Sequence, residues 1–143
     1  MEKLFLIQSI NMMQEIFKSD RYFTVFDIVI SHGQLLLRSQ KNDESEKNID
    51  IVFFDTTYIQ MFSRLKGIRI SKVKNESNYV SYSTVQKYLE YDNTHLFELE
   101  SNNEKYYIAA SFVRVFENQL EFNESSLYIE EGRKVEIATS VDW

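Results

Sequence analysis

Residues 96–117, LFELESNNEKYYIAASFVRVFE, carry the clearest β-hairpin pattern of the 143-residue chain. Two runs rich in apolar and aromatic side chains, 96–100 and 105–117, are joined by the polar segment 101–104. Such runs around turn-forming residues are typical of paired antiparallel strands. The second run is apolar on both of its alternating faces, so we expect a central strand that is covered on both sides.

Strand-like runs continue on both sides of this hairpin. Residues 23–30 and 35–39 flank a His32-Gly33 turn, where Gly33 can adopt the positive φ that a tight hairpin requires. Further strands are expected at 49–54, 58–62, 67–73, 127–130 and 134–139, the last two around a turn at 131–133. Together these runs predict an antiparallel sheet of about seven to nine strands with hairpin and meander connections.

Two segments carry a helical pattern instead. In 4–18, apolar side chains recur at the spacing of one helix face: Leu6, Ile10, Met13 and Phe17. Residues 4–7 alone fit a short strand equally well. Ser83 is a suitable N-cap for a short helix near 83–91, although an irregular aromatic loop fits that segment too. We therefore expect a single α+β domain spanning 1–143, dominated by the antiparallel sheet, with an N-terminal helix.

The composition excludes several kinds of chemistry. The chain has no Cys, which removes disulfides, thiolate metal sites and a cysteine nucleophile. It has three Gly and neither a Walker A motif nor a Gly-x-Gly-x-x-Gly motif, so no phosphate-binding loop is expected. The two histidines, His32 and His95, fit a turn and a strand edge better than a catalytic triad. We expect no catalytic residues, no metal and no cofactor, and the sequence favours a protein that is not an enzyme.

The apolar runs also bear on location. Residues 4–7 are too few for the apolar core of a secretory signal, and no run approaches the roughly 20 residues of a membrane span. The expectation is a soluble cytoplasmic protein that does not bind a membrane.

Two aspartates interrupt strands that are otherwise apolar. Asp27 lies among Val25 and Val29, and Asp50 alternates with the apolar residues of 49–54. If buried, either carboxylate would need partners. We favour the alternative, in which these strands expose one face to water.

Charge is unevenly distributed along the chain. Residues 1–72 hold ten basic and nine acidic side chains, whereas 73–143 hold six and thirteen. Segment 90–131 combines most of this acidic excess with many aromatic residues, which are enriched at protein interfaces. A short basic stretch, 64–74, is too small to favour nucleic-acid binding against the overall net charge of −6. Acidic residues also keep proteins soluble, and aromatic residues fill β-rich cores, so both patterns have a structural explanation as well.

The hypothesis that follows is a non-enzymatic interaction protein that binds a basic protein, such as an immunity or inhibitor protein against a cationic toxin. Its expected contact residues are acidic or aromatic: Glu98, Glu100, Glu104, Tyr106, Glu117, Glu121 and Glu124. One alternative is a small-ligand-binding domain with a cavity at the small residues 109–111. Another is an enzyme that uses carboxylates alone, and a homodimer through the sheet is also open.

Overall fold

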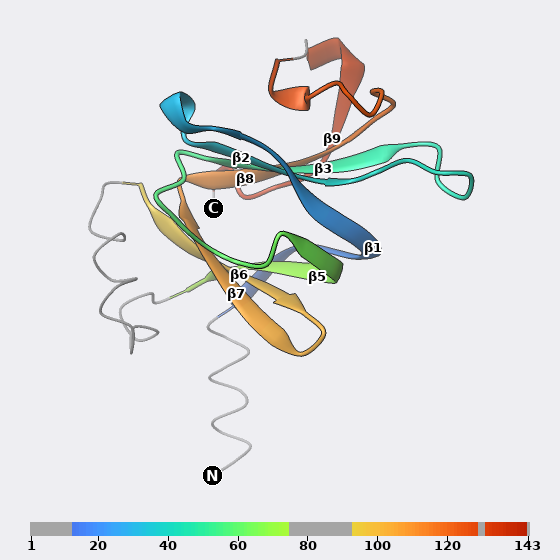
Figure 1. Ribbon diagram of the computed structural model, residues 1–143. Coiled ribbons are helices and arrows are strands. Elements are labelled where there is room, and N and C mark those ends of the chain that lie inside the picture. The colour runs from blue at the N-terminus through green and yellow to red at the C-terminus, as the bar shows by residue number, and fades with distance from the viewer. Residues whose placement is uncertain (1–12, 75–92, 129–130, 143) are drawn as a thin grey trace.

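The computed structural model describes residues 13–74, 93–128 and 131–142 (Figure 1). The expected short helix near 83–91 lies outside these residues, as does the first part of the expected N-terminal helix, 4–12.

One antiparallel sheet of nine strands forms the described structure, which confirms the expected antiparallel sheet. In chain order the strands are β1 (Met13–Val29), β2 (Gln34–Ser39), β3 (Asn48–Phe54), β4 (Tyr58–Gln60), β5 (Arg64–Val73), β6 (His95–Ser101), β7 (Glu104–Ala110), β8 (Phe112–Asn118) and β9 (Lys134–Thr139). Their order across the sheet is β4-β7-β6-β5-β1-β2-β3-β8-β9.

The expected α+β class is wrong, because the described residues contain no α-helix. Their only helical elements are short 3-10 turns: η1 (Ile30–His32), η3 (Ser126–Tyr128) and η4 (Glu131–Arg133). Residues 13–18, predicted to end the N-terminal helix, begin β1 and pair with β5 from Met13 opposite Val73. At a bulge between Glu15 and Phe17, the partly buried Ile16 and Phe17 both pack against the main core. A spacing of four residues places side chains on one face of a strand as well as of a helix, so this spacing does not distinguish the two. Pairing with β5 makes the segment a strand, and the bulge then shifts the alternation of its side chains.

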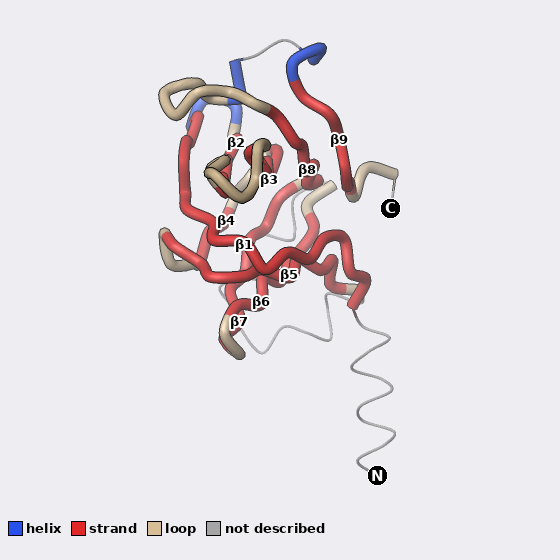
Figure 2. Tube along the Cα trace, turned by 90° about the vertical axis from the view of Figure 1, so that its right-hand side faces the viewer, coloured by secondary structure: helices blue, strands red, loops and turns tan. Residues whose placement is uncertain are grey.

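The bends between β3 and β4 and between β7 and β8 bring the two halves of the sheet together around the main core. The long β1 pairs with β5 along its first part and with β2 along its last part. β3 leads into β4 and β7 leads into β8, while β3 pairs with β8 and β4 with β7. Figure 1 shows β2, β3 and β8 above and β5, β6 and β7 below, with β1 crossing between them. Among the described strands, β9 pairs with β8 alone and lies at the outer edge in Figure 2.

The main core fills the space between these two halves. Phe53 of β3 and Phe97 of β6 meet there edge to face, with ring centroids 5.7 Å apart. The expected continuous strand 105–117 is broken at Ser111, whose amide donates to the carbonyl of Phe54. This break shifts the alternation, so that residues expected on opposite faces share one core: Ile108, Ala110, Val113 and Val115. Ala109 and Ala110 are fully buried.

The turns follow the local chemistry of the chain. Gly33 ends η1 with φ +60°, as expected for the β1–β2 hairpin. Asn102 and Asn103, between β6 and β7, have φ +52° and +63°, a conformation that Asn tolerates better than most residues. Of the expected strand 127–130, residues 127 and 128 belong to the turn η3, and Leu127 packs on a second cluster of Leu36, Val52 and Phe116. Residues 129–130 lie outside the described part of the chain.

Candidate functional site

A buried ion pair lies at the end of β2 and β3. Arg38 and Asp50 sit opposite each other in the β2–β3 register and are 1% and 0% exposed. Arg38 donates two hydrogen bonds to the Asp50 carboxylate, Nε–Oδ1 at 2.7 Å and Nη2–Oδ2 at 2.8 Å. The Arg38 guanidinium also stacks on Phe26, 4.0 Å from the ring centroid. The expectation that Asp50 faces water is therefore wrong.

Two buried asparagines extend this pair into a network. Asn118 Nδ2 donates to Asp50 Oδ2, and Asn48 Nδ2 donates to Asn118 Oδ1, both at 2.8 Å. Asn48 also donates to the Leu120 carbonyl at 2.9 Å. Each buried charge or amide thus has specific partners, as burial of such groups requires.

The network holds the segment 119–125, which we call the pinned turn. Arg38 Nη1 donates to the Glu124 carbonyl at 2.8 Å, and the Leu120 amide donates to Asn118 Oδ1 at 3.2 Å. The amide of Glu124 donates to the carbonyl of Glu121, and the Glu124 carboxylate accepts from the Glu121 amide, both at 3.0 Å. Ser125 then donates to Asp27 at 2.6 Å, so Asp27 is half-buried and bonded. The backbone of the turn is therefore fixed from beneath by buried side chains.

The outer side of the pinned turn is exposed and acidic. Phe122, at its tip, is 75% exposed and meets Phe26 edge to face. The hydrogen bond from the Glu121 amide, followed by that from Arg133, lowers the pKa of the Glu124 carboxyl below its usual range. Glu121 lies 3.4 Å from Lys41 and is itself largely exposed. The turn therefore presents an aromatic ring between two carboxylates.

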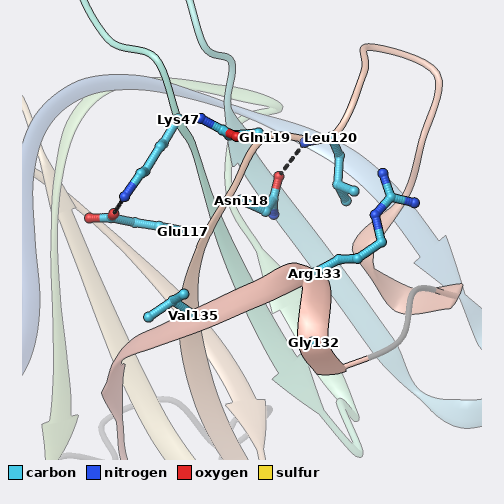
Figure 3. Close-up of a pocket in the computed structure, with 8 residues that line it drawn as sticks. All are labelled: Lys47, Glu117, Asn118, Gln119, Leu120, Gly132, Arg133 and Val135. Atoms are coloured by element: carbon cyan, nitrogen blue, oxygen red, sulfur yellow. Dashed lines mark hydrogen bonds and ion pairs between the residues drawn. The ribbon is translucent and has the colours of Figure 1, made fainter.

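A hollow of about 450 Å³ lies beside the pinned turn (Figure 3). The Lys47–Glu117 pair, at 3.6 Å, stands on one side, and Arg133 on the other, with Asn118 between them. Val135 of the edge strand β9 also lines this hollow and is 64% exposed. Charged and apolar groups are thus available on one continuous surface.

The seven residues predicted as contacts fall into two groups. Glu121 and Glu124 belong to the pinned turn, and Glu117 lines the hollow beside it. The other four lie on the β6–β7 hairpin at the opposite end in Figure 1: Glu98, Glu100, Glu104 and Tyr106. In that second group Glu98 is buried and lies 3.6 Å from Lys105, so its carboxylate is not a free contact.

The remaining members of the hairpin group are more accessible. Tyr106 donates to Glu104 at 3.3 Å and meets the exposed Phe62 edge to face. Partial desolvation, followed by the Glu104 carboxylate, raises the pKa of the Tyr106 hydroxyl. Glu100 lies opposite both Arg69 and Lys105 in the strand register. The hairpin therefore mixes both signs of charge, and the two groups do not form one acidic face.

Sequence reasoning missed the buried side chains that shape the site: Arg38, Asn48 and Asn118. A signal for Arg38 was available, since it is a charged residue in the predicted strand 35–39 and Asp50 interrupts the predicted strand 49–54, which the structure places beside it. Opposite charges facing each other across a hairpin stabilise the pairing.

Comparison with protein-family models, with curated proteins and with solved structures finds no match. Within the described residues, no group of three or more His, Asp or Glu side chains is placed to hold a metal ion. The same part of the chain contains no helix long and apolar enough to cross a membrane.

Proposed function

We propose that this protein is a non-enzymatic binding domain that docks a basic protein on the pinned turn and Glu117. The observation that carries the proposal is the buried Arg38–Asp50–Asn118–Asn48 network beneath an exposed turn. These side chains fix the backbone of 119–125 while its outward side chains, Glu121 and Phe122, face solvent. Binding residues are commonly carried by loops that a rigid scaffold positions.

The chemistry of the surface supports a cationic partner. Glu117, Glu121 and Glu124 each lie within 3.6 Å of a cation of the same chain, so a partner would compete with Lys47, Lys41 and Arg133. These pairs are at the surface, where such interactions contribute little, and exchanging them costs little. Phe122 provides a large apolar contact of the kind that anchors interfaces. An inhibitor of a cationic enzyme, such as a nuclease, is one form of this function.

Photocrosslinking tests the proposal. A benzoylphenylalanine in place of Phe122 is compared with the same group in place of Phe62, which is also exposed but adjoins the hairpin group at Tyr106. In the cells that make the protein, we expect one basic protein to crosslink from position 122 and not from 62. High salt weakens an electrostatic complex, so capture of the partner before crosslinking should be salt-sensitive.

Charge reversal provides the second arm. Glu121→Lys should abolish or strongly reduce crosslinking of that protein, whereas Glu104→Lys, the same change on the hairpin group, should leave it unaffected. Crosslinking from 62 alone, or equal loss with both variants, would refute the assignment to the pinned turn.

A further inference from the structure

A second hollow, of about 640 Å³, lies between β1, the end of β2 and the tip of the pinned turn. Its walls include the side chains of Arg21, Tyr22, Phe26 and Phe122. Volumes of this size are typical of sites for small molecules. We call this space the Arg21 hollow.

The Arg21 guanidinium is fixed without a counter-ion. Its Nε donates to Ser39 Oγ at 2.9 Å, and its Nη2 donates to the carbonyls of Ser39 and Gln40 at 3.2 Å each. All three acceptors are neutral, and no carboxylate of the described residues lies within ion-pair distance of Arg21. Its Nη1 has no hydrogen-bond partner in the described part of the chain.

Burial lowers the pKa of Arg21, and the carboxylate of Glu117 offsets this only in part. Because its hydrogen-bond acceptors are neutral, the positive charge of this half-buried guanidinium is available to pair with an anionic ligand. The fork of N–H groups that Arg presents matches phosphate and carboxylate oxygens.

Two aromatic side chains of the hollow, Tyr22 and Phe122, are exposed to solvent. Tyr22 is 50% exposed and Phe122 is 75% exposed. Phe26 contacts both the Arg38 guanidinium and the Phe122 ring, with centroid distances of 4.0 and 6.4 Å. Exposed aromatic rings offer faces on which a flat ligand can stack.

The hollow contains other charged side chains besides Arg21. Asp20, Glu44 and Lys41 also line it. Lys41 Nζ already donates to the Gln119 carbonyl at 2.8 Å and lies near Glu121. Arg21, by contrast, has a whole nitrogen, Nη1, without a hydrogen-bond partner among the described residues.

From this geometry we infer that the Arg21 hollow binds a small aromatic molecule that carries an anionic group. Arg21 receives the anion, and the aromatic walls, Tyr22 and Phe122, contact the flat ring. The inference does not require the proposed protein partner, but because the two sites share Phe122, the small molecule and the partner would compete for that ring.

The test is an NMR titration of the full chain that follows backbone amides and the Arg Nε–H groups. The probes are phenyl phosphate, inorganic phosphate and phenol, which separate the contributions of ring and anion. We expect phenyl phosphate to shift Arg21 Nε–H and the Tyr22 amide saturably, and to bind about tenfold or more tightly than either fragment. Adenosine monophosphate and free phosphotyrosine then show whether a nucleotide or a phosphorylated side chain fits better.

Variants make the outcome decisive. Arg21→Gln should weaken phenyl phosphate binding about tenfold or more, and Tyr22→Ser should weaken it without removing the response to phosphate. Arg64→Gln, which removes an exposed arginine of β5 outside the hollow, should change nothing. Equal binding of the three probes, binding unchanged by Arg21→Gln, or shifts centred on Arg64 would overturn the inference. Failure of this site would leave the crosslinking test of the pinned turn unaffected.

Discussion

Arg38 and Asp50 face each other across the β2–β3 hairpin and form a two-point ion pair that is almost completely buried. The remaining donor of Arg38, Nη1, reaches the Glu124 carbonyl, which lies 86 residues further along the chain. One side chain thus links the sheet to the turn that carries Phe122. The pair is more than a local stabiliser, because it determines where an exposed segment lies.

Removing one partner of this pair should lower the free energy of unfolding by several kcal/mol. In Asp50→Ala the Arg38 charge stays buried without its carboxylate, and breaking a buried pair in this way costs about 3–5 kcal/mol. Urea unfolding followed by circular dichroism measures the change. Glu136→Ala is the matched control, since Glu136 pairs with Arg114 at 2.6 Å but is 32% exposed. For that surface pair we expect a loss of about 0–1 kcal/mol. Similar losses in both variants would contradict the special role of the buried pair.

Asn118→Ala should release the pinned turn. The variant leaves the Leu120 amide, Asn48 Nδ2 and Asp50 Oδ2 each without one partner, at an expected total cost of about 1–3 kcal/mol. Hydrogen exchange under native conditions should show faster exchange at the Leu120 amide than the loss of global stability explains. Asn123→Ala, at the exposed tip of the same turn, should leave that amide protected. Unchanged protection of Leu120 in Asn118→Ala would show that the other contacts suffice.

Gly33 should tolerate no side chain. Its φ is +60°, and an added Cβ would lie 3.1 Å from both the Asp55 Cα and the Thr56 nitrogen. Its carbonyl also accepts a hydrogen bond from the Thr56 amide at 2.8 Å, so the backbone cannot easily move away. We expect Gly33→Ala to lower the free energy of unfolding by about 1–3 kcal/mol. Gly132→Ala is the control, because nothing lies within 4 Å of its Cβ position. Equal melting temperatures for the two variants would contradict this account.

Local patterns predicted the hairpins well. The β1–β2 and β6–β7 hairpins lie where alternating apolar runs meet Gly33 or the Asn102-Asn103 pair. Strand alternation and turn residues act over a few positions, so they can be recognised without knowing the rest of the fold. Over residues 13–18 the predicted helix was wrong for the complementary reason, since β1 is a strand there through its pairing with β5, about fifty to sixty residues away.

The site was harder to predict because distant segments build it. Asn48 and Asn118 are 70 residues apart, and their contact depends on β3 lying beside β8. The separation of Glu117 from Glu104 depends on which end of the sheet each strand reaches, and a count of charges along the chain does not contain that information. The acidic excess of 90–131 was real, but the fold divides the seven predicted contact residues of this segment between two places, the β6–β7 hairpin and the end of β8 with the pinned turn.

The pH dependence of stability should report on Glu124. Its pKa is lowered in the folded protein by the Glu121 amide first and by Arg133 next. A carboxyl whose folded pKa lies below its unfolded value stabilises the fold above the unfolded pKa. That stabilisation is lost as the pH falls through the folded pKa, where the carboxylate takes up a proton. Wild type should therefore lose more stability than Glu124→Gln between neutral pH and about pH 3, as measured by urea unfolding at each pH. Glu104→Gln, on the hairpin, is the control and should show the same pH dependence as wild type. If the free energy of unfolding of wild type and of Glu124→Gln changes with pH in the same way, the Glu124 charge does not stabilise the turn.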